Sequence, residues 1–373
     1  MQRKDLHAVV DDIARFHTIA EQRPEQFSYE FLYQLCTDNF AICRALGVEV
    51  LQVAQLDQAQ ELTVGALCEH RDLITARRAT HVRLLHGDLH LRNICMFKGK
   101  PTLFDGIEFN DDYACCDTWA DIAFLIMDLM YHMVPQFACA VLNRYLEATD
   151  DFAGLPLARL FTAYRAMVRA KVNCIELDEH LVHASADAAR NHLALALQAL
   201  HNSEPQIIAV GGLSGSGKST LALALAEKLD AIVIRSDAVR KHLLNCALDQ
   251  KAPASAYAED VSQRTYAGMR ERAVYALNSG RTVILDAVHA KESRREALQD
   301  FAATRGTPFT GLWCEVPHEV ACARLIARHG DVSDADIGVL QQQSVRELGH
   351  LTWRKVDTSR PVQEIIEMLI DTM

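Results

Sequence analysis

Hydrophobic residues recur at helical spacing along most of the first 200 residues of the chain. The first such segment, Leu6–Phe16, places apolar side chains three or four positions apart, which predicts one buried helix face. The same periodicity predicts further helices over 28–46, 63–77, 117–132, 137–147, 155–177 and 183–200. Strand-like runs are few in this part: Val82–Leu85, then Ile94–Phe97 and Thr102–Phe104, which a Lys-Gly-Lys-Pro turn joins as a hairpin.

The pattern changes after residue 206, where short apolar runs alternate with amphipathic segments. Strands are predicted at 207–211, 231–235, 282–286 and 309–315, and helices at 218–229, 237–246, 258–279, 292–305, 317–328, 334–348 and 361–371. Such alternation predicts an α/β fold, a parallel sheet with helices on both faces, which binds ligands beyond the carboxyl ends of its strands. Polar residues and Pro205 mark a linker, so we expect two domains, 1–203 and 204–373.

Composition narrows the class of protein. Half of the 373 residues are apolar and 23% are charged, which is typical of a globular protein. The apolar runs are too short to span a membrane, and the N-terminus lacks a signal-peptide core, so we expect a cytoplasmic protein without a membrane partner. The eleven cysteines form no C-x-x-C pair and the histidines no zinc-binding spacing, which predicts reduced thiols and no zinc.

Charge is distributed unevenly along the chain. Residues 1–205 hold 18 Lys and Arg against 28 Asp and Glu, a net charge of −10, whereas 206–373 hold 20 against 21, a net charge of −1. An acidic half and a near-neutral half both argue against a nucleic-acid partner. The acidic half suits a cationic or neutral ligand, or it is a solvated acidic surface, and no pattern indicates an oligomeric state.

A complete phosphate-binding motif lies between the first predicted strand of the second part and the helix that follows it. The motif and the next residue are Gly212, Leu213, Ser214, Gly215, Ser216, Gly217, Lys218, Ser219 and Thr220. A strand, a glycine-rich turn and a helix N-terminus gather backbone N–H groups around one concavity. The motif predicts ATP and Mg²⁺ as cofactors, with Lys218 at the β/γ-phosphates and the Ser219 hydroxyl on the metal.

Further charged residues follow the predicted strands. Asp237 can accept the proton of an acceptor hydroxyl, or it can simply cap the next helix; Asp286 can hold Mg²⁺, or it is a loop aspartate. Arg324 and Arg328 share one face of a predicted helix. They can be arginines of a mobile lid that neutralise charge on the transferred phosphate, or they can form a solvated cationic stripe. We also expect four cations to line the acceptor side: Arg240, Lys241, Arg294 and Arg295. Trp313 is expected to be a core residue.

A second constellation lies in the first part. His86 to Asn93 reads His-Gly-Asp-Leu-His-Leu-Arg-Asn, and Asp105 follows twelve residues after Asn93, beyond the predicted hairpin. Phosphoryl transfer requires a carboxylate near the acceptor hydroxyl and oxygen ligands for the metal. Asp88 would be the catalytic carboxylate, and Asn93 and Asp105 the metal ligands; singly, each could be a turn or cap residue.

These motifs resemble a known family. Residues 86–93 and 103–128 resemble the aminoglycoside phosphotransferases, whose fold is similar to the protein kinases. Joined to a phosphate-loop domain, they resemble the bacterial bifunctional aminoglycoside phosphotransferase/ATP-binding proteins over nearly the whole chain. The resemblance implies a mostly helical kinase-like C-lobe followed by an AAA-type ATP-binding domain similar to gluconate kinases, zeta toxins and polynucleotide kinases, with Asp237 acting on the acceptor.

One departure from that family concerns the first domain. Only 85 residues precede His86; they are predicted to be helical, hold the glycines Gly47 and Gly65, and contain no lysine after Lys4. The nucleotide-binding lobe of a kinase is therefore expected to be missing and the first domain inactive. The favoured function is an ATP-dependent kinase for a small hydroxylated molecule. Alternatives are a nucleotide-dependent switch that uses the first domain as a scaffold, and a nucleic-acid end kinase.

Overall fold

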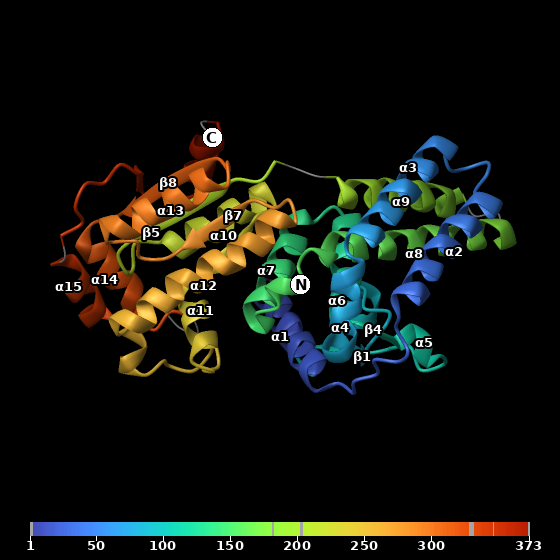
Figure 1. The fold of residues 1–373 in the computed structure, drawn as a ribbon, viewed down its shortest axis with the longest axis horizontal. Coiled ribbons are helices and arrows are strands. Elements are labelled where there is room, and N and C mark those ends of the chain that lie inside the picture. Colours follow the sequence, from blue (N-terminus) through green and yellow to red (C-terminus); the bar gives the residue numbers. More distant parts are fainter. Residues whose placement is uncertain (1–2, 181–182, 202–203, 328–331, 346, 372–373) are drawn as a thin grey trace. The chain divides into compact units, whose positions relative to one another are not determined.

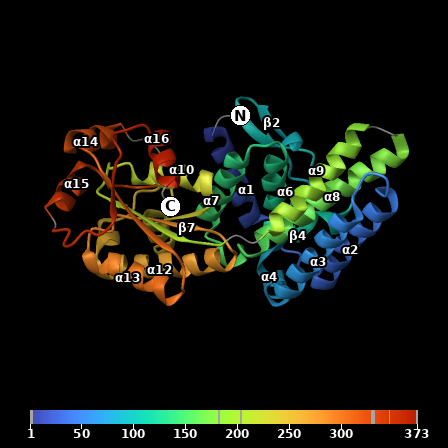
Figure 2. The same cartoon turned by 90° about the horizontal axis from the view of Figure 1, so that it is seen from above.

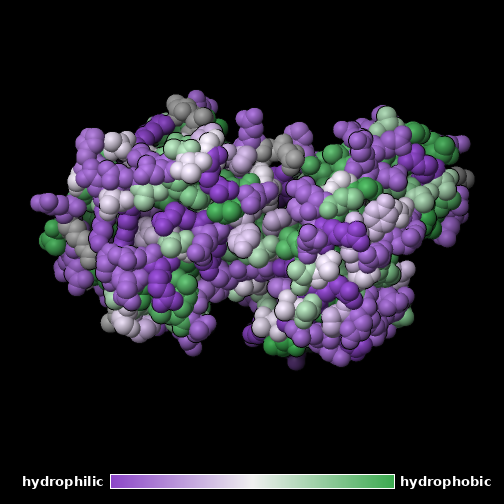
Figure 3. All heavy atoms as spheres, viewed as in Figure 1, coloured by the Kyte–Doolittle hydropathy of each residue, from purple (hydrophilic) through white to green (hydrophobic). Residues whose placement is uncertain are grey.

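The computed structural model describes residues 3–180, 183–201, 204–327, 332–345 and 347–371. The chain divides into two compact units. Unit 1 comprises Met1–Tyr145 and Ala153–Asn202, and unit 2 comprises Leu146–Phe152 and Ser203–Met373. Within the described residues, every helix is too short or too polar to cross a lipid bilayer. On the face drawn in Figure 3, hydrophilic residues predominate and hydrophobic residues are interspersed among them.

Long helices build unit 1. They are α1 (Arg3–Ile19), α2 (Tyr29–Leu46), α3 (Val53–Glu69), α4 (Arg71–His81), α6 (Thr118–Tyr131), α7 (Pro135–Thr149), α8 (Leu157–His180) and α9 (His183–Leu200). Helices α8 and α9 pack along each other, with α2 and α3 beside them (Figure 1). Helix α6 is buried on every side from Thr118 to Met127, so it forms the centre of this unit.

The helix predicted over 63–77 is wrong, because the structure contains two helices there. His70 lies between α3 and α4 with φ −100° and ψ 13°, ending one helix and starting the next. Leu67 and Ile74 are both buried and lie seven residues apart, which is the spacing of one continuous helical stripe. The apolar pattern therefore continues across a break that only the backbone at His70 reveals.

Two small antiparallel sheets complete unit 1. Strand β1 (Val82–Leu84) pairs with β4 (Cys115–Asp117), and β2 (Ile94–Phe97) pairs with β3 (Lys100–Leu103) as the predicted hairpin. Strand β4 was not predicted, because three residues are too few to show an alternating pattern. Single turns of helix also occur, at η1 (Leu91–Asn93), α5 (Asp111–Ala114) and η2 (Phe152–Gly154).

Unit 2 contains a five-stranded sheet of parallel strands in the order β6-β7-β5-β8-β9. The strands are β5 (Ile207–Gly212), β6 (Ile232–Arg235), β7 (Val283–Asp286), β8 (Phe309–Glu315) and β9 (Arg354–Asp357). The first four were predicted, and β9 was missed because its residues are mostly charged and exposed. Strands β5 and β7 are buried along their whole length, as expected for a sheet covered on both faces.

Helices cover both faces of this sheet. They are α10 (Lys218–Leu229), α11 (Ser236–Leu243), α12 (Glu259–Asn278), α13 (Glu292–Thr304), α14 (His318–Ile326), α15 (Ile337–Ser344) and α16 (Val362–Ile370), with a single turn at η3 (Ala254–Tyr257). Figure 2 shows α12 and α13 on one side of the sheet and α10 and α16 on the other. This arrangement confirms the predicted mixed α/β fold.

Two tryptophans enclose the strand that leads into the phosphate-binding turn. A Cβ placed on Gly211 would lie 2.9 Å from the ring of Trp313 and 3.0 Å from the ring of Trp353. Both rings are buried, so Trp313 is a core residue, as predicted. Because any side chain at position 211 would collide with these rings, glycine is required there.

Candidate functional site

The phosphate-binding turn joins β5 to α10 through two glycines in the left-handed region. Gly215 has φ 79°, and Gly217, which caps α10, has φ 83°. A Cβ on Gly215 would lie 2.6 Å from the carbonyl oxygen of Ala321, so a larger residue does not fit. The turn therefore leads directly into the N-terminus of α10, where the helix dipole favours an anion.

The predicted loop residues fall into two groups. Gly215, Gly217, Lys218, Ser219 and Thr220 line a cavity of about 460 Å³. The others hold the turn in place. Leu213 packs against the apolar cluster of α14 and α15, the N–H of Ser214 donates to Gln343 Oε1 at 2.8 Å, and the carbonyl of Ser216 accepts a hydrogen bond from Thr358.

Arg324 lies against this cavity, and its guanidinium is partly engaged. Its Nη2 donates to the carbonyl of Thr358 at 2.7 Å, while Nη1 is buried, has no partner among the described residues, and lies 3.0 Å from where a Cβ of Gly217 would be. An unpartnered buried donor beside a phosphate-binding turn suits contact with a polyanion. Arg328, predicted to act with Arg324, lies outside the described residues.

Among the polar residues that line this cavity, sequence reasoning missed two. Thr358 and Arg360 line it from the turn between β9 and α16. No sequence signal was available to find them, because β9 itself was not predicted. They line the first cavity and not the second.

Asp286 ends β7 beside the phosphate-binding turn and provides oxygen atoms suited to a hard cation. Its side chain is 2% exposed, and its Oδ1 has no hydrogen-bond partner among the described residues. Ser219 is near enough to favour the charged form of this carboxylate and so lower its pKa, and Arg235 Nε lies 3.7 Å from Oδ2. Mg²⁺ prefers oxygen ligands and retains several waters, so Ser219 and Asp286 fit its requirements.

Burial raises the pKa of Asp286 above the usual carboxyl value, although the charges of Lys218 and Arg235 oppose the shift. A raised folded-state pKa means that Asp286 stabilises the fold most at low pH, and that this contribution is lost as the pH rises through the folded pKa. We therefore predict that Asp286→Asn raises the thermal midpoint of the nucleotide-free protein, and that the gain grows as the pH rises above about 4. The same substitution is expected to weaken Mg²⁺-dependent nucleotide binding.

Thermal unfolding of both proteins between pH 4 and pH 8 checks this prediction. Asp300→Asn provides the matched control, because Asp300 is exposed on α13 and lines neither cavity. Its unfolding curve is expected to follow the wild-type curve at every pH. If the thermal midpoints of Asp286→Asn and the wild type differ by the same amount at every pH, the raised pKa assigned to Asp286 is wrong.

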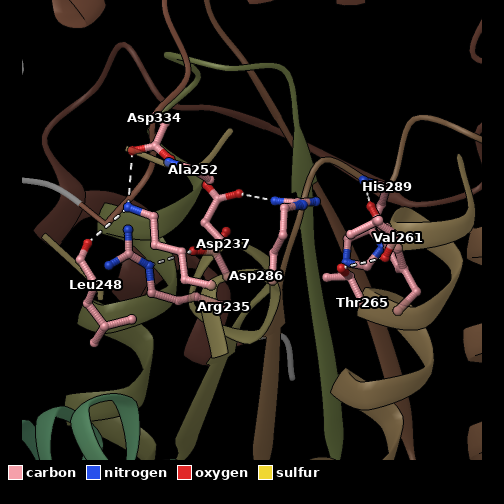
Figure 4. Close-up of polar contacts among 12 residues, drawn as sticks. Arg235, Asp237, Leu248, Ala252, Val261, Thr265, Asp286, His289 and Asp334 are labelled. Carbon is pink, nitrogen blue, oxygen red and sulfur yellow. Dashed lines mark hydrogen bonds and ion pairs between the residues drawn. The ribbon is translucent and has the colours of Figure 1, made fainter. Parts of the chain in front are cut away.

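A second cavity, of about 390 Å³, opens on the other side of Lys218. Asp237, in the first turn of α11, lines it together with Lys218 and Ser236. Burial disfavours the charged form of Asp237, but Arg240, a hydrogen bond from Ser333 and the charge of Lys218 outweigh it, so its pKa is lowered. Asp237 is therefore an ionised acceptor in the same cavity lining as Lys218. It lies near the carboxyl ends of the strands (Figure 4).

Two of the four cations predicted for the acceptor side line this cavity, and two do not. Arg240 and Arg294 line it. Lys241 is instead 1% exposed, and its Nζ contacts Asp334 Oδ1 at 3.0 Å and the carbonyl of Leu248 at 2.9 Å (Figure 4). The prediction for Lys241 is wrong because its charge is used to hold two loops together.

Arg295 is likewise structural. It is 3% exposed and donates to four backbone carbonyls, those of His289, Ala290, Leu348 and His350. A charge in the sequence does not reveal whether its partners are backbone groups or a ligand. Tyr257 and Tyr266, which also line the second cavity, were not predicted, because aromatic residues at helical spacing resemble core positions.

In unit 1 the structure brings two of the three predicted residues into contact. Asn93 Nδ2 lies 3.1 Å from Asp88 Oδ2 and 2.9 Å from the Asp88 carbonyl. Asp105 contributes its backbone carbonyl at 3.4 Å, while its side chain is exposed. Burial disfavours the charge of Asp88, but the hydrogen bond and charge of His90 outweigh this effect and lower its pKa.

Asp121 supports this loop from α6, and sequence reasoning assigned it no role. The carboxylate is fully buried; its Oδ1 accepts from the N–H of Gly87 at 2.8 Å, and its Oδ2 lies 3.1 Å from His17 Nε2. His17 Nδ1 in turn lies 2.9 Å from the hydroxyl of Tyr145. The turn before Asp88 is thus anchored to a polar cluster inside the helical core.

Comparison with protein families identifies the phosphate-binding part. Residues 207–346 match the family model AAA_33, described as an AAA domain. Structural similarity is found to a gluconokinase from Sinorhizobium meliloti 1021 (24% identity, 45% of this chain, 90% of that chain, TM-score 0.32). It is also found to Chaetomium thermophilum Kti12 in complex with ADP-AlF3 (18% identity, 44% of this chain, 97% of that chain, TM-score 0.33). Similarity at this level does not identify an acceptor.

Similarity to curated proteins extends over both units. The uncharacterized protein Rv2004c of Mycobacterium tuberculosis (strain ATCC 25618 / H37Rv) is 30% identical over 365 residues, which cover 95% of this chain and 73% of that protein. The uncharacterized protein Mb2027c of Mycobacterium bovis matches to the same extent. Because the match covers 95% of this chain and so runs through both of its units, the chain belongs to the same family as these mycobacterial proteins.

Proposed function

We propose that unit 2 is an ATP-dependent kinase that transfers the γ-phosphate to a small hydroxylated molecule. One observation carries this proposal: Lys218 lines both the cavity at the phosphate-binding turn and the second cavity that contains Asp237. A nucleotide whose phosphates lie along the turn would point its terminal phosphate at Lys218, and the second cavity would hold the acceptor on the far side.

The residues present suit such a transfer. The backbone N–H groups of the turn and the Lys218 ammonium would bind the β- and γ-phosphates, and Arg324 Nη1 would add a further donor. Mg²⁺, held by Ser219 and through water by Asp286, would neutralise charge on the phosphates. The ionised Asp237 would accept a hydrogen bond from the acceptor hydroxyl and orient its oxygen toward phosphorus, which aligns the reacting groups.

For unit 1 we propose an aminoglycoside-phosphotransferase-like C-lobe without transfer activity of its own, with the domain boundary near residues 203 and 204. The contact between Asn93 and Asp88 supports the family assignment. The exposed side chain of Asp105 supports the inactivity, because only its backbone carbonyl approaches Asn93 and a predicted metal ligand is therefore not in place.

Product analysis tests the kinase proposal. Protein is incubated with γ-labelled ATP, Mg²⁺ and pooled hydroxylated metabolites, and we expect label on an organic product. Asp237→Asn keeps the size of the side chain but removes the charge that orients the hydroxyl, so transfer is predicted to fall about a hundredfold or more. Nucleotide affinity is expected to change little, because Asp237 does not line the first cavity.

The alternative function is a nucleotide-dependent switch. Label found only in inorganic phosphate across the whole metabolite set, at the same rate in wild type and Asp237→Asn, would favour the switch. The nucleotide cavity would then be used for hydrolysis, and unit 1 would be its scaffold.

A further inference from the structure

The lining of the second cavity is more positive than the chain that forms it. The whole chain has a net charge of −11, and residues 206–373 have a net charge of −1. Five cations nevertheless line this cavity, against three carboxylates. The cations are Lys218, Arg240, Lys251, Lys291 and Arg294.

The three carboxylates of the lining are already engaged by the protein. Asp334 accepts from Lys241 at 3.0 Å and from the N–H of Ala252 at 2.9 Å (Figure 4). Asp336 accepts from the N–H of Val339 at 3.0 Å as the cap of α15, and Asp237 pairs with Arg240 at 2.5 Å. Because Asp334 pairs with Lys241, which does not line the cavity, the lining retains more positive than negative charge.

At one side of the cavity, two cations share a single carboxylate. Lys291 Nζ lies 2.8 Å from Glu259 Oε2, and Arg294 Nη2 lies 3.3 Å from Glu259 Oε1. The Arg294 guanidinium also stacks over the ring of Tyr266, with its central carbon 4.3 Å from the ring centroid. This stacking holds Arg294 in place, with its side chain 21% exposed, while one unit of positive charge remains without a counter-charge.

Near Asp237, a second arginine is held in the same manner. The Arg240 guanidinium lies 4.7 Å from the centroid of the Tyr257 ring, and Arg240 is 7% exposed. Its Nε is buried and has no partner among the described residues. Buried donors are normally hydrogen-bonded, so an Nε beside a polar cavity indicates a missing acceptor atom.

We propose that the acceptor molecule carries an anionic group, a carboxylate or a phosphate, which Arg294 and Lys291 bind with help from Arg240. This inference rests on the proposed kinase function and names the substrate class of that site. The hydroxyl of the acceptor then lies at Asp237. Its oxygen forms the new bond to the γ-phosphorus as the bond to the β-phosphate oxygen breaks; ADP leaves, and the hydroxyl proton passes through Asp237 to water.

A single sugar skeleton in four charge states tests the proposal. Glucose, glucosamine, glucuronate and glucose 6-phosphate are offered with γ-labelled ATP, within a wider set of neutral, cationic and anionic polyols. Phosphorylation of anionic members is expected to exceed that of neutral and cationic ones. Arg294→Gln should then lower kcat/KM for the anionic acceptor about tenfold or more, since a charge-assisted hydrogen bond is lost.

Arg305→Gln is the matched control. Arg305 caps the same helix, α13, and its guanidinium lies over the Phe301 ring as that of Arg294 lies over Tyr266, but it does not line the cavity. It is expected to behave as wild type. Arg294→Lys, which keeps the charge but not the planar fork, should recover part of the activity toward the anionic acceptor.

Binding decides the question if no sugar is phosphorylated. Glucuronate and inorganic phosphate are titrated calorimetrically into protein saturated with AMPPNP and Mg²⁺, which fills the phosphate-binding turn beforehand. Anion binding that weakens about tenfold in Arg294→Gln and not in Arg305→Gln supports the proposal. Equal binding by both variants, no anion binding at all, or a preference for neutral acceptors overturns it.

The kinase function and the anionic substrate class are tested by different outcomes. If AMPPNP does not bind, the kinase function is wrong whatever the anion titration shows. If AMPPNP binds and neutral polyols are phosphorylated in preference to anionic ones, the kinase function stands and the anionic substrate class is wrong.

Discussion

Lys218→Ala is expected to lower phosphoryl transfer at least about a thousandfold. Lys218 begins α10 and is the residue shared by the two cavities, so its ammonium would touch the phosphate that moves. Charge that develops on the phosphoryl oxygens would then lack its nearest cation in a site shielded from water. Single-turnover transfer of label from γ-labelled ATP measures the loss directly.

The control for this experiment is Lys228→Ala, on the last turn of the same helix. Lys228 is exposed and lines neither cavity, so the variant removes an equal charge and should retain wild-type transfer. Titration with AMPPNP shows whether the Lys218 variant still folds and binds nucleotide. Undiminished turnover in Lys218→Ala would contradict the proposed site.

The second large effect is expected on stability, at a buried ion pair in unit 1. Arg77 Nε and Nη2 donate to the two carboxylate oxygens of Asp117 at 2.7 and 3.0 Å, and each side chain is 4% exposed. Asp117 Oδ1 also accepts from the N–H of Trp119 and thereby caps α6. Arg77→Ala leaves Asp117 buried without its counter-ion, which costs about 3–5 kcal/mol of unfolding free energy.

Urea unfolding followed by hydrogen exchange and mass spectrometry can check this value. Peptides of unit 1 should lose protection at lower urea, while peptides of β5 to β8 should unfold as in wild type. Arg44→Ala is the matched control: Arg44 pairs with Asp57 at 2.6 Å, but the two side chains are 42% and 59% exposed. That variant should shift stability by no more than about 1 kcal/mol, and a similar loss in both would refute the role assigned to burial.

The phosphate-binding turn could be predicted from the sequence because its determinants are local. Gly215 and Gly217 adopt positive φ, and Lys218 starts a helix, all within a few residues of one another. Strand β5, which leads into the turn, and its neighbour β7 are continuous apolar runs because the sheet is buried on both faces. A parallel sheet also places its carboxyl ends together, so Asp237 and Asp286 could be expected near the turn before any distance was known.

The remaining site residues depend on contacts that sequence patterns do not encode. Arg294 and Arg295 are neighbours on α13, yet one lines a cavity and the other binds backbone carbonyls. Thr358 lies at the nucleotide cavity only because β9 joins the sheet edge, and β9 has no apolar alternation. In unit 1, His17 and Asp121 are 104 residues apart in sequence, so their contact is visible only in the fold.

The two indole rings that enclose Gly211 give unit 2 an intrinsic optical reporter. The rings of Trp313 and Trp353 face Gly211, which is one residue before the glycine-rich turn, and the chain has only one other tryptophan, Trp119 in α6 of unit 1. Replacing Trp119 with phenylalanine would therefore leave a protein whose tryptophan emission arises solely beside the turn. Occupancy of the turn by a nucleotide could then be followed in real time, without attaching a dye.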